Sequence, residues 1–178
     1  LALNTATGEQ VWTLPRITTA NYSTPCLLGN GRSTKVIFSS RDRGISAVDT
    51  ASGNLLWELA VFRSHVAVAS PIVAGRFIVG VSGGVGVREE LVAIEVKDRE
   101  SGRPVERYRL EQATPFVPTP LAYRDMLFSI SDEGVAMCVD LKSGKTHWKK
   151  RLKNKFYSSP VCVSGKIYVA ATDGEMFV

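Results

Sequence analysis

The sequence predicts an all-β protein assembled from repeated antiparallel sheets, and three observations lead to this prediction. A phrase of eleven residues, typified by Ala-Val-Asp-Thr-Ala-Ser-Gly-Asn-Leu-Leu-Trp at 47–57, returns with small changes at 2–12 and 138–148. A fourth, degenerate copy has its glycine at residue 102. The turn glycines of the four copies recur roughly every 45 residues, a spacing typical of repeat arrays. No segment shows a sustained helical period with capping residues at its ends.

The unit that contains the phrase at 47–57 is the second, and its apolar and β-branched residues predict its first strands. Residues 35–40 predict a strand, residues 42–44 supply a turn, and residues 45–48 alternate well enough to predict a second strand. Residues 49–53 then make a tight connection, because aspartate can bond to its own backbone and glycine accepts a positive φ.

The rest of the unit completes a set of four strands. Residues 55–59 predict the third strand. Residues 66–73 predict the fourth, which is almost wholly apolar and should therefore be buried on both faces.

Equivalent parts recur in the other units. A Ser-Pro or Thr-Pro pair opens the same place in each, at residues 24–25, 70–71, 119–120 and 159–160. Four short antiparallel strands per unit predict the blade of a β-propeller. A β-sandwich is the alternative all-β fold, but it does not require the same tryptophan and the same turn in every repeat.

Composition limits the function classes only loosely. The chain has 178 residues, 44% hydrophobic and 22% charged, which is ordinary for a globular protein, and it holds no apolar run as long as a membrane span. Its net charge of +5 suits an anionic partner or simple solubility. The three cysteines, Cys26, Cys138 and Cys162, have no metal-site spacing and are expected to be buried apolar groups.

The repeated phrase, followed by Ser-Pro-x-Val and a hairpin ending in Asp-Gly, resembles the PQQ-like β-propeller repeat over essentially the whole chain. That family contains quinoprotein alcohol dehydrogenases and non-catalytic propellers such as the lipoprotein of the bacterial barrel-assembly machine. The resemblance implies a single domain over residues 1–178, with about four blades that form part of a seven- or eight-bladed ring.

The resemblance also implies which residues join the blades. In the family each tryptophan packs between neighbouring blades and the glycine opens the turn beneath it. The positions that match are Gly8, Trp12, Gly53, Trp57, Gly102, Gly144 and Trp148. The third unit departs from the pattern with Glu95 for aspartate, inserted residues at 97–100 and no tryptophan, a gap that Tyr108 further along is expected to fill only in part, so we expect a weaker joint there.

Nothing in the sequence points to catalysis. A quinoprotein dehydrogenase site implies an adjacent cysteine pair, a further tryptophan and carboxylate ligands for calcium, and none of these is visible. Asp49 and Asp140 lie in repeat turns, where a structural role is favoured over that of a general base. His65 and His147 form no metal motif. No catalytic, cofactor-binding or metal-binding residue is therefore predicted.

We expect instead a non-enzymatic scaffold that binds proteins in the bacterial cell envelope or outside the cell. Candidate partner-binding residues precede the Ser/Thr-Pro pairs or form a basic segment; they are Tyr22, His65, Phe116, Tyr157, Lys149, Lys150, Arg151, Lys153 and Lys155. The basic segment suits an acidic protein, an anionic lipid or a cell-wall polymer, or it is a solvated outer strand. Nucleic acid is disfavoured because few aromatic residues interleave these charges.

Two alternatives stay open. One is a partial quinoprotein dehydrogenase, dependent on PQQ and calcium, whose active-site half lies outside this sequence. The other is a sensory or extracellular domain attached to a further domain such as a kinase. The resemblance alone implies a periplasmic or secreted location.

Overall fold

The computed structural model describes residues 1–16, 21–31, 34–63, 66–84, 86–97 and 103–178. Every named element in these ranges is a β-strand. Within them, no helix has the length and apolar character needed to cross a bilayer.

The described strands form five antiparallel sheets, three of them with four strands each. The first complete sheet contains β3 (Cys26–Leu28), β4 (Lys35–Ser40), β5 (Gly44–Asp49) and β6 (Leu55–Leu59). The second contains β7 (Ile72–Ala74), β8 (Phe77–Gly84), β9 (Val87–Glu95) and β10 (Val105–Leu110). The third contains β11 (Leu121–Tyr123), β12 (Met126–Ile130), β13 (Val135–Asp140) and β14 (Thr146–Arg151).

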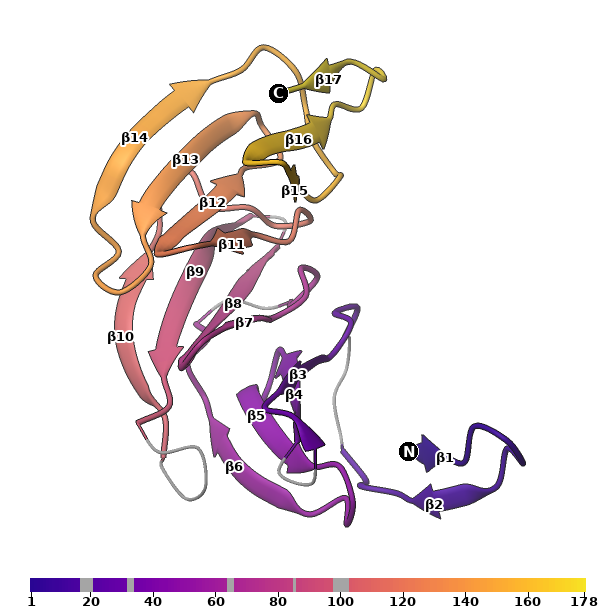
Figure 1. Ribbon diagram of the computed structural model, residues 1–178. Coiled ribbons are helices and arrows are strands. Elements are labelled where there is room, and N and C mark those ends of the chain that lie inside the picture. The colour runs from indigo at the N-terminus through magenta and orange to yellow at the C-terminus, as the bar shows by residue number, and fades with distance from the viewer. Residues whose placement is uncertain (17–20, 32–33, 64–65, 85, 98–102) are drawn as a thin grey trace.

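Smaller sheets stand at the two ends of the row. At the N-terminal end, β1 (Ala2–Leu3) pairs with β2 (Gln10–Trp12). At the C-terminal end, β15 (Val161–Val163), β16 (Lys166–Ala170) and β17 (Met176–Phe177) form a three-stranded sheet. Figure 1 shows the sheets side by side along an open arc, with β7, β11 and β15 on its concave side and β6, β10 and β14 on its convex side.

This arrangement confirms the prediction of four-stranded propeller blades. Strand order within each complete sheet follows the chain, so every blade is a simple meander from the inner strand to the outer one. The sandwich alternative requires two stacked layers, whereas the described sheets succeed one another around a curve. The two end sheets together carry strands equivalent to those of a fourth blade.

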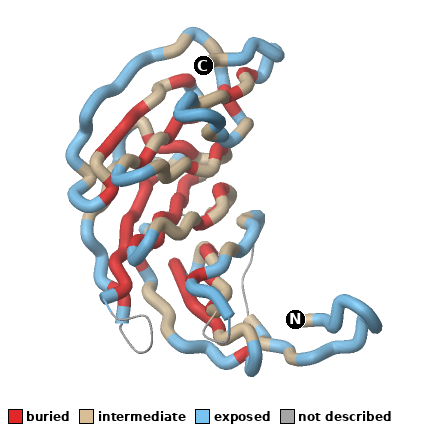
Figure 2. Tube along the Cα trace, in the orientation of Figure 1, coloured by how far each residue is buried: buried red, intermediate tan, exposed pale blue. Residues whose placement is uncertain are grey.

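The apolar core lies between successive blades. On β9, Val92 and Ile94 pack toward the sheet β3–β6, while Leu91 and Ala93 pack toward the sheet β11–β14. Successive residues of a strand point to opposite faces, so a run of apolar residues serves both interfaces. Figure 2 accordingly shows buried residues along the middle strands and exposed residues on the outer ones.

One predicted strand is much shorter than expected. The segment 66–73 was predicted to form one strand, but within its described residues Val66 makes a single bridge to Gly83 and β7 begins only at Ile72. Pro71 has no N–H to donate to a neighbouring strand, which explains why the ladder is interrupted before it.

Candidate functional site: blade joints and loop surface

The repeated phrase folds into a turn that is held by its own side chain. The Asp49 carboxylate accepts hydrogen bonds from the backbone of Ser52 at 2.8 Å and from the Ser52 hydroxyl at 2.8 Å, and Asp140 is held in the same way by Ser143. These bonds, from the backbone and side chain of Ser52 at Asp49 and from the side chain and backbone of Ser143 at Asp140, lower the pKa of both carboxyl groups. Both groups therefore stay ionised at neutral pH and are weak general bases.

Aromatic side chains from one sheet lie on the glycine turns of the next. The Trp12 ring covers Gly53 so closely that a Cβ there would lie 2.6 Å from it, and the indole N–H donates to the Thr50 carbonyl at 2.9 Å. Tyr108 covers Gly144 equivalently, with a ring atom 2.5 Å from the position of a Cβ. Tyrosine thus occupies the tryptophan position in the divergent third unit.

The remaining predicted joint residues are placed differently from one another. Trp57 is half-buried and packs against the core between the sheets β3–β6 and β7–β10. Trp148 is 47% exposed and lies beside Phe128, with ring centroids 6.2 Å apart. Gly8 has no atom within 4 Å of a Cβ position, and Gly102 lies outside the described residues. The docking role of the set stays a prediction, which substitutions can test.

We expect Gly144→Ala to lower the free energy of unfolding by about 2–3 kcal/mol, since the new methyl group would overlap the Tyr108 ring. Alanine would also be strained at the φ of +70° found there. Gly75→Ala is a matched control, because Gly75 has a φ of +62° but open space around its Cβ position. Urea unfolding of both variants measures the difference, and equal losses would show that the ring contact contributes nothing.

A row of hydrogen bonds links the inner ends of the blades through the Ser/Thr-Pro pairs. The N–H of Thr24 donates to the Ser70 hydroxyl at 3.1 Å, that of Ser70 to the Thr119 hydroxyl at 3.0 Å, and that of Thr119 to the Ser159 hydroxyl at 2.9 Å. We call these four residues the hydroxyl belt. The sequence pattern marked their positions, but it did not indicate that each residue bonds to the next blade.

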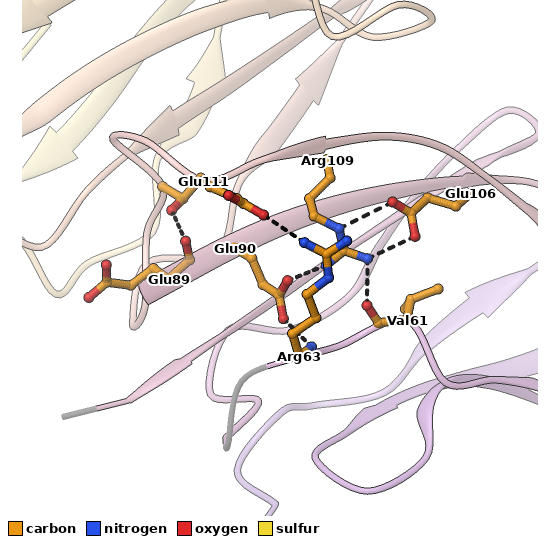
Figure 3. A network of polar contacts seen from close by, with 8 residues as sticks. Val61, Arg63, Glu89, Glu90, Glu106, Arg109 and Glu111 are labelled. Atoms are coloured by element: carbon orange, nitrogen blue, oxygen red, sulfur yellow. Dashed lines mark hydrogen bonds and ion pairs between the residues drawn. The ribbon is translucent and has the colours of Figure 1, made fainter. Parts of the chain in front are cut away.

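A buried ion network fastens the connection between β6 and β7 to the second complete sheet (Figure 3). The Arg109 guanidinium pairs with Glu90 and, at 2.8 Å, with Glu106, and it donates to the Val61 carbonyl at 2.6 Å. Glu90 also accepts the backbone N–H of Arg63 at 2.5 Å. The Glu90 and Arg109 side chains are only 3% and 10% exposed. The adjacent Glu89 and Glu90 suggest a solvated rim when the sequence is taken alone, but Glu90 is buried, because its partners come from distant parts of the chain.

The candidate partner-binding residues lie in loops that enter successive blades. Tyr22 and Tyr157 are 70% and 58% exposed, whereas Phe116 is half-buried against Gly83. His65 lies outside the described residues. Because each loop leads from an outer strand to the next inner strand, equivalent loops open on the same end of the blades. We call this end of the blades the loop surface. Two exposed tyrosines lie on it, Tyr22 before β3 and Tyr157 before β15.

The basic candidates lie on strand β14 and in the segment that comes after it. All five are exposed: Lys149, Lys150, Arg151, Lys153 and Lys155. Lys150 lines a cavity shared with Trp148 on one face of the strand, and Lys149 lines a hollow beside Arg109 on the other. The positive charges of the basic segment are thus divided between two faces of an outer strand.

The cysteines do not meet in the structure. Cys26, Cys138 and Cys162 belong to β3, β13 and β15, which are strands of three different sheets. Burial raises the pKa of Cys26 to about 11, so its thiol is a poor nucleophile at neutral pH. Among the described residues, no group of three or more His, Cys, Asp and Glu side chains is placed to hold a metal ion.

Comparison with known proteins places the whole sequence in one repeat family. The family described as outer membrane protein assembly factor BamB matches residues 1–108 and residues 94–178. A relative from Marinobacter adhaerens (strain DSM 23420 / HP15), also named outer membrane protein assembly factor BamB, is 30% identical over 77 residues. That alignment covers 43% of this chain and 19% of the relative.

Solved structures share the fold at low identity. The crystal structure of BamB from Moraxella catarrhalis matches 98% of this chain and 49% of its own, with a TM-score of 0.63 and 20% identity. Quinohemoprotein alcohol dehydrogenase from Comamonas testosteroni matches 98% of this chain and 37% of its own, with a TM-score of 0.71 and 15% identity. The chain thus spans about half the length, or less, of the Marinobacter relative and of these two solved structures, and the structures show a common fold alone.

Proposed function

The chain belongs to the outer membrane protein assembly factor BamB family, and we propose that it is a non-catalytic propeller segment that binds protein partners in the bacterial cell envelope. The match of the family over the full sequence is the observation that carries this proposal. The names of the matched proteins point to outer membrane protein assembly as the process. A single domain over residues 1–178, forming part of a larger ring, belongs to the same proposal.

The geometry of the repeat turns supports a scaffold over an enzyme. Asp49 and Asp140 are engaged by their own turns, and the bonds that hold them lower their pKa values. The likeness to a quinohemoprotein alcohol dehydrogenase rests on 15% identity, and it carries no cofactor chemistry over to this chain.

The loop surface supports a protein partner. Tyr22 and Tyr157 present large aromatic side chains to solvent on loops that the blades hold in place. Aromatic residues of this kind commonly dominate the binding energy of protein interfaces. The exposed basic residues of β14 would add attraction to an acidic protein or an anionic surface, an effect that salt weakens.

The test is a pull-down from a detergent-solubilised bacterial envelope extract. The bait proteins are the unmodified chain, a Tyr22→Ala/Tyr157→Ala variant, and a Leu55→Ala/Leu56→Ala control that removes two exposed apolar side chains from the outer strand β6. We expect the unmodified chain and the control to recover outer-membrane assembly proteins, identified by mass spectrometry, and the tyrosine variant to lose them. Equal recovery by all three baits would contradict the role of the loop surface.

A further inference from the structure

A hollow of about 480 Å³ lies between the second and third complete sheets. It is bordered by two hairpin loops of two residues each, at 75–76 and 124–125, and by the turn that follows β13. Because β7 and β11 both begin at the loop surface, the hairpins that follow them open on the opposite end of the blades. We call this space the turn hollow. Its walls belong to two adjoining blades that each have all four strands.

The turn hollow has an apolar floor and a charged rim. The buried side chains of Phe77 and Leu141 contribute to its floor. The charged residues that line it are all exposed, and they are Arg76, Arg124, Asp125 and Lys142. Three cations against one carboxylate leave a formal excess of two positive charges at neutral pH. This combination suits a dianion that carries a small apolar group.

Arg76 is held in position by a buried carboxylate. The Glu95 side chain is 5% exposed, and it accepts from the Nε of Arg76 at 2.7 Å and from the Nε of Arg107 at 3.1 Å. The Arg76 guanidinium also lies 5.8 Å from the centroid of the Phe77 ring. Since two guanidinium groups share one carboxylate, the three side chains keep a net positive charge. Glu95 therefore orients Arg76 without cancelling the attraction that this side of the hollow has for anions.

Arg124 combines a strained backbone with a guanidinium that has no acidic partner. Its φ is +56°, and the equivalent first loop positions of the neighbouring blades are taken by Gly75 and Ser164, which carry no charge. Because the left-handed region favours glycine, the turn itself does not require arginine. Within the described ranges the Arg124 guanidinium forms no ion pair, and it lies 5.2 Å from the centroid of the Tyr123 ring. Strain of this kind is often retained where a side chain is needed for function.

The two hairpin loops are fastened to their own blades by equivalent bonds. The N–H of Val96 donates to the Arg76 carbonyl at 2.9 Å, and the N–H of Leu141 donates to the Asp125 carbonyl at 2.9 Å. Lys142 follows Leu141 directly, and its ammonium group pairs with the Asp125 carboxylate at 3.1 Å. The rim is thus built on ordered backbone, which reduces the entropy that a ligand must overcome on binding.

We propose that the turn hollow binds a small organic phosphate monoester. Its phosphate lies between Arg76, Arg124 and Lys142, and its apolar part rests on Phe77 and Leu141. Guanidinium groups match phosphate oxygens and can donate two parallel hydrogen bonds to them. A phosphate monoester carries nearly two negative charges at neutral pH, which balances the excess charge of the rim. The inference does not depend on partner binding at the loop surface.

The first test is isothermal titration calorimetry with phenyl phosphate at fixed ionic strength. Arg124→Gln should raise the dissociation constant about tenfold or more, and Lys142→Gln about threefold or more. Lys145→Gln is the matched control and should leave the dissociation constant unchanged, because Lys145 is exposed on the same connection but does not line the hollow. Equal losses from the two lysine variants would indicate diffuse attraction and overturn the proposal, as would the absence of binding by the unmodified chain.

The second test separates binding from folding. Arg124→Gly should weaken phenyl phosphate binding as much as Arg124→Gln does, while its urea midpoint should not fall, because glycine suits a φ of +56°. Asp125→Asn should tighten binding, since the carboxylate that competes for Lys142 is removed. A lower urea midpoint for Arg124→Gly would show that the arginine is needed for the fold and would overturn its assignment to a ligand.

The third test defines the ligand class by comparing probes on the unmodified chain. Inorganic phosphate should bind more weakly than phenyl phosphate because it lacks an apolar part, and succinate, a dianion without phosphate, should bind more weakly still. Equal affinity for succinate would overturn the assignment to phosphate. Vesicles of phosphatidylcholine with phosphatidic acid test a lipid source of the same group. If the chain sediments with them and Arg124→Gln abolishes this, the ligand is a lipid headgroup, and the proposal of a small soluble compound is overturned.

Discussion

Glu90→Ala is expected to lower the free energy of unfolding by about 3–5 kcal/mol, because it leaves a buried guanidinium without its buried carboxylate partner and with only the more exposed Glu106. Glu90 is 3% exposed and Arg109 is 10% exposed, so water cannot replace the lost partner. The substitution also leaves the N–H of Arg63 without the acceptor that it has at 2.5 Å. Chemical denaturation of the purified variant measures the loss.

Glu106→Ala is the matched control for this network. Glu106 bonds to the same guanidinium at 2.8 Å, but it is 39% exposed, and its removal should cost about 1 kcal/mol or less. Replacing Glu90 and Arg109 together by leucine should cost less than Glu90→Ala alone, because no buried charge is left unpaired and Glu106 is exposed enough to be solvated. If Glu90→Ala and Glu106→Ala have equal effects, the burial of the network does not determine its strength.

Trp57→Ala is expected to lower the free energy of unfolding by about 3–4 kcal/mol. The ring packs against the core between the sheets β3–β6 and β7–β10, in the middle of the arc, and alanine would leave a cavity there. The cost is set toward the low end of the usual range because Trp57 is only half-buried. Thermal and urea unfolding both measure it.

Tyr157→Ala controls for the loss of an aromatic ring as such. Tyr157 is 58% exposed, and its removal should change stability by less than about 0.5 kcal/mol. A Trp57→Ala variant that unfolds like the Tyr157→Ala variant would contradict the docking role predicted for the tryptophans.

The blades were predictable because their signals are local. Strands β4 and β6 have the bounds predicted for them, since a run of β-branched and apolar residues between turn residues is enough to define a strand. The turn at Gly53 was predictable for the same reason, as aspartate and glycine act within a few residues of each other. Pro71 was also a local signal, and the shortened β7 should have followed from it.

The contacts between blades were less predictable, because their partners are distant in sequence. Glu90 follows Glu89 and looks like a surface residue, yet it is buried by Arg109, which is 19 residues away, and by the backbone of Arg63, which is 27 residues away. The hydroxyl belt was visible only as a repeated Ser/Thr-Pro pair, and the bonds span 40 to 49 residues. Such pairs become apparent only once the blades are in position.

The hydroxyl belt has a consequence for how proteins of this kind can change length during evolution. Each joint uses the same backbone donor and the same type of hydroxyl, wherever it lies along the row. A gene duplication that copies one whole unit therefore brings both halves of a working joint with it. Blade number can change by such events without the simultaneous invention of new contacts, while a change inside one unit must remain compatible with two neighbours.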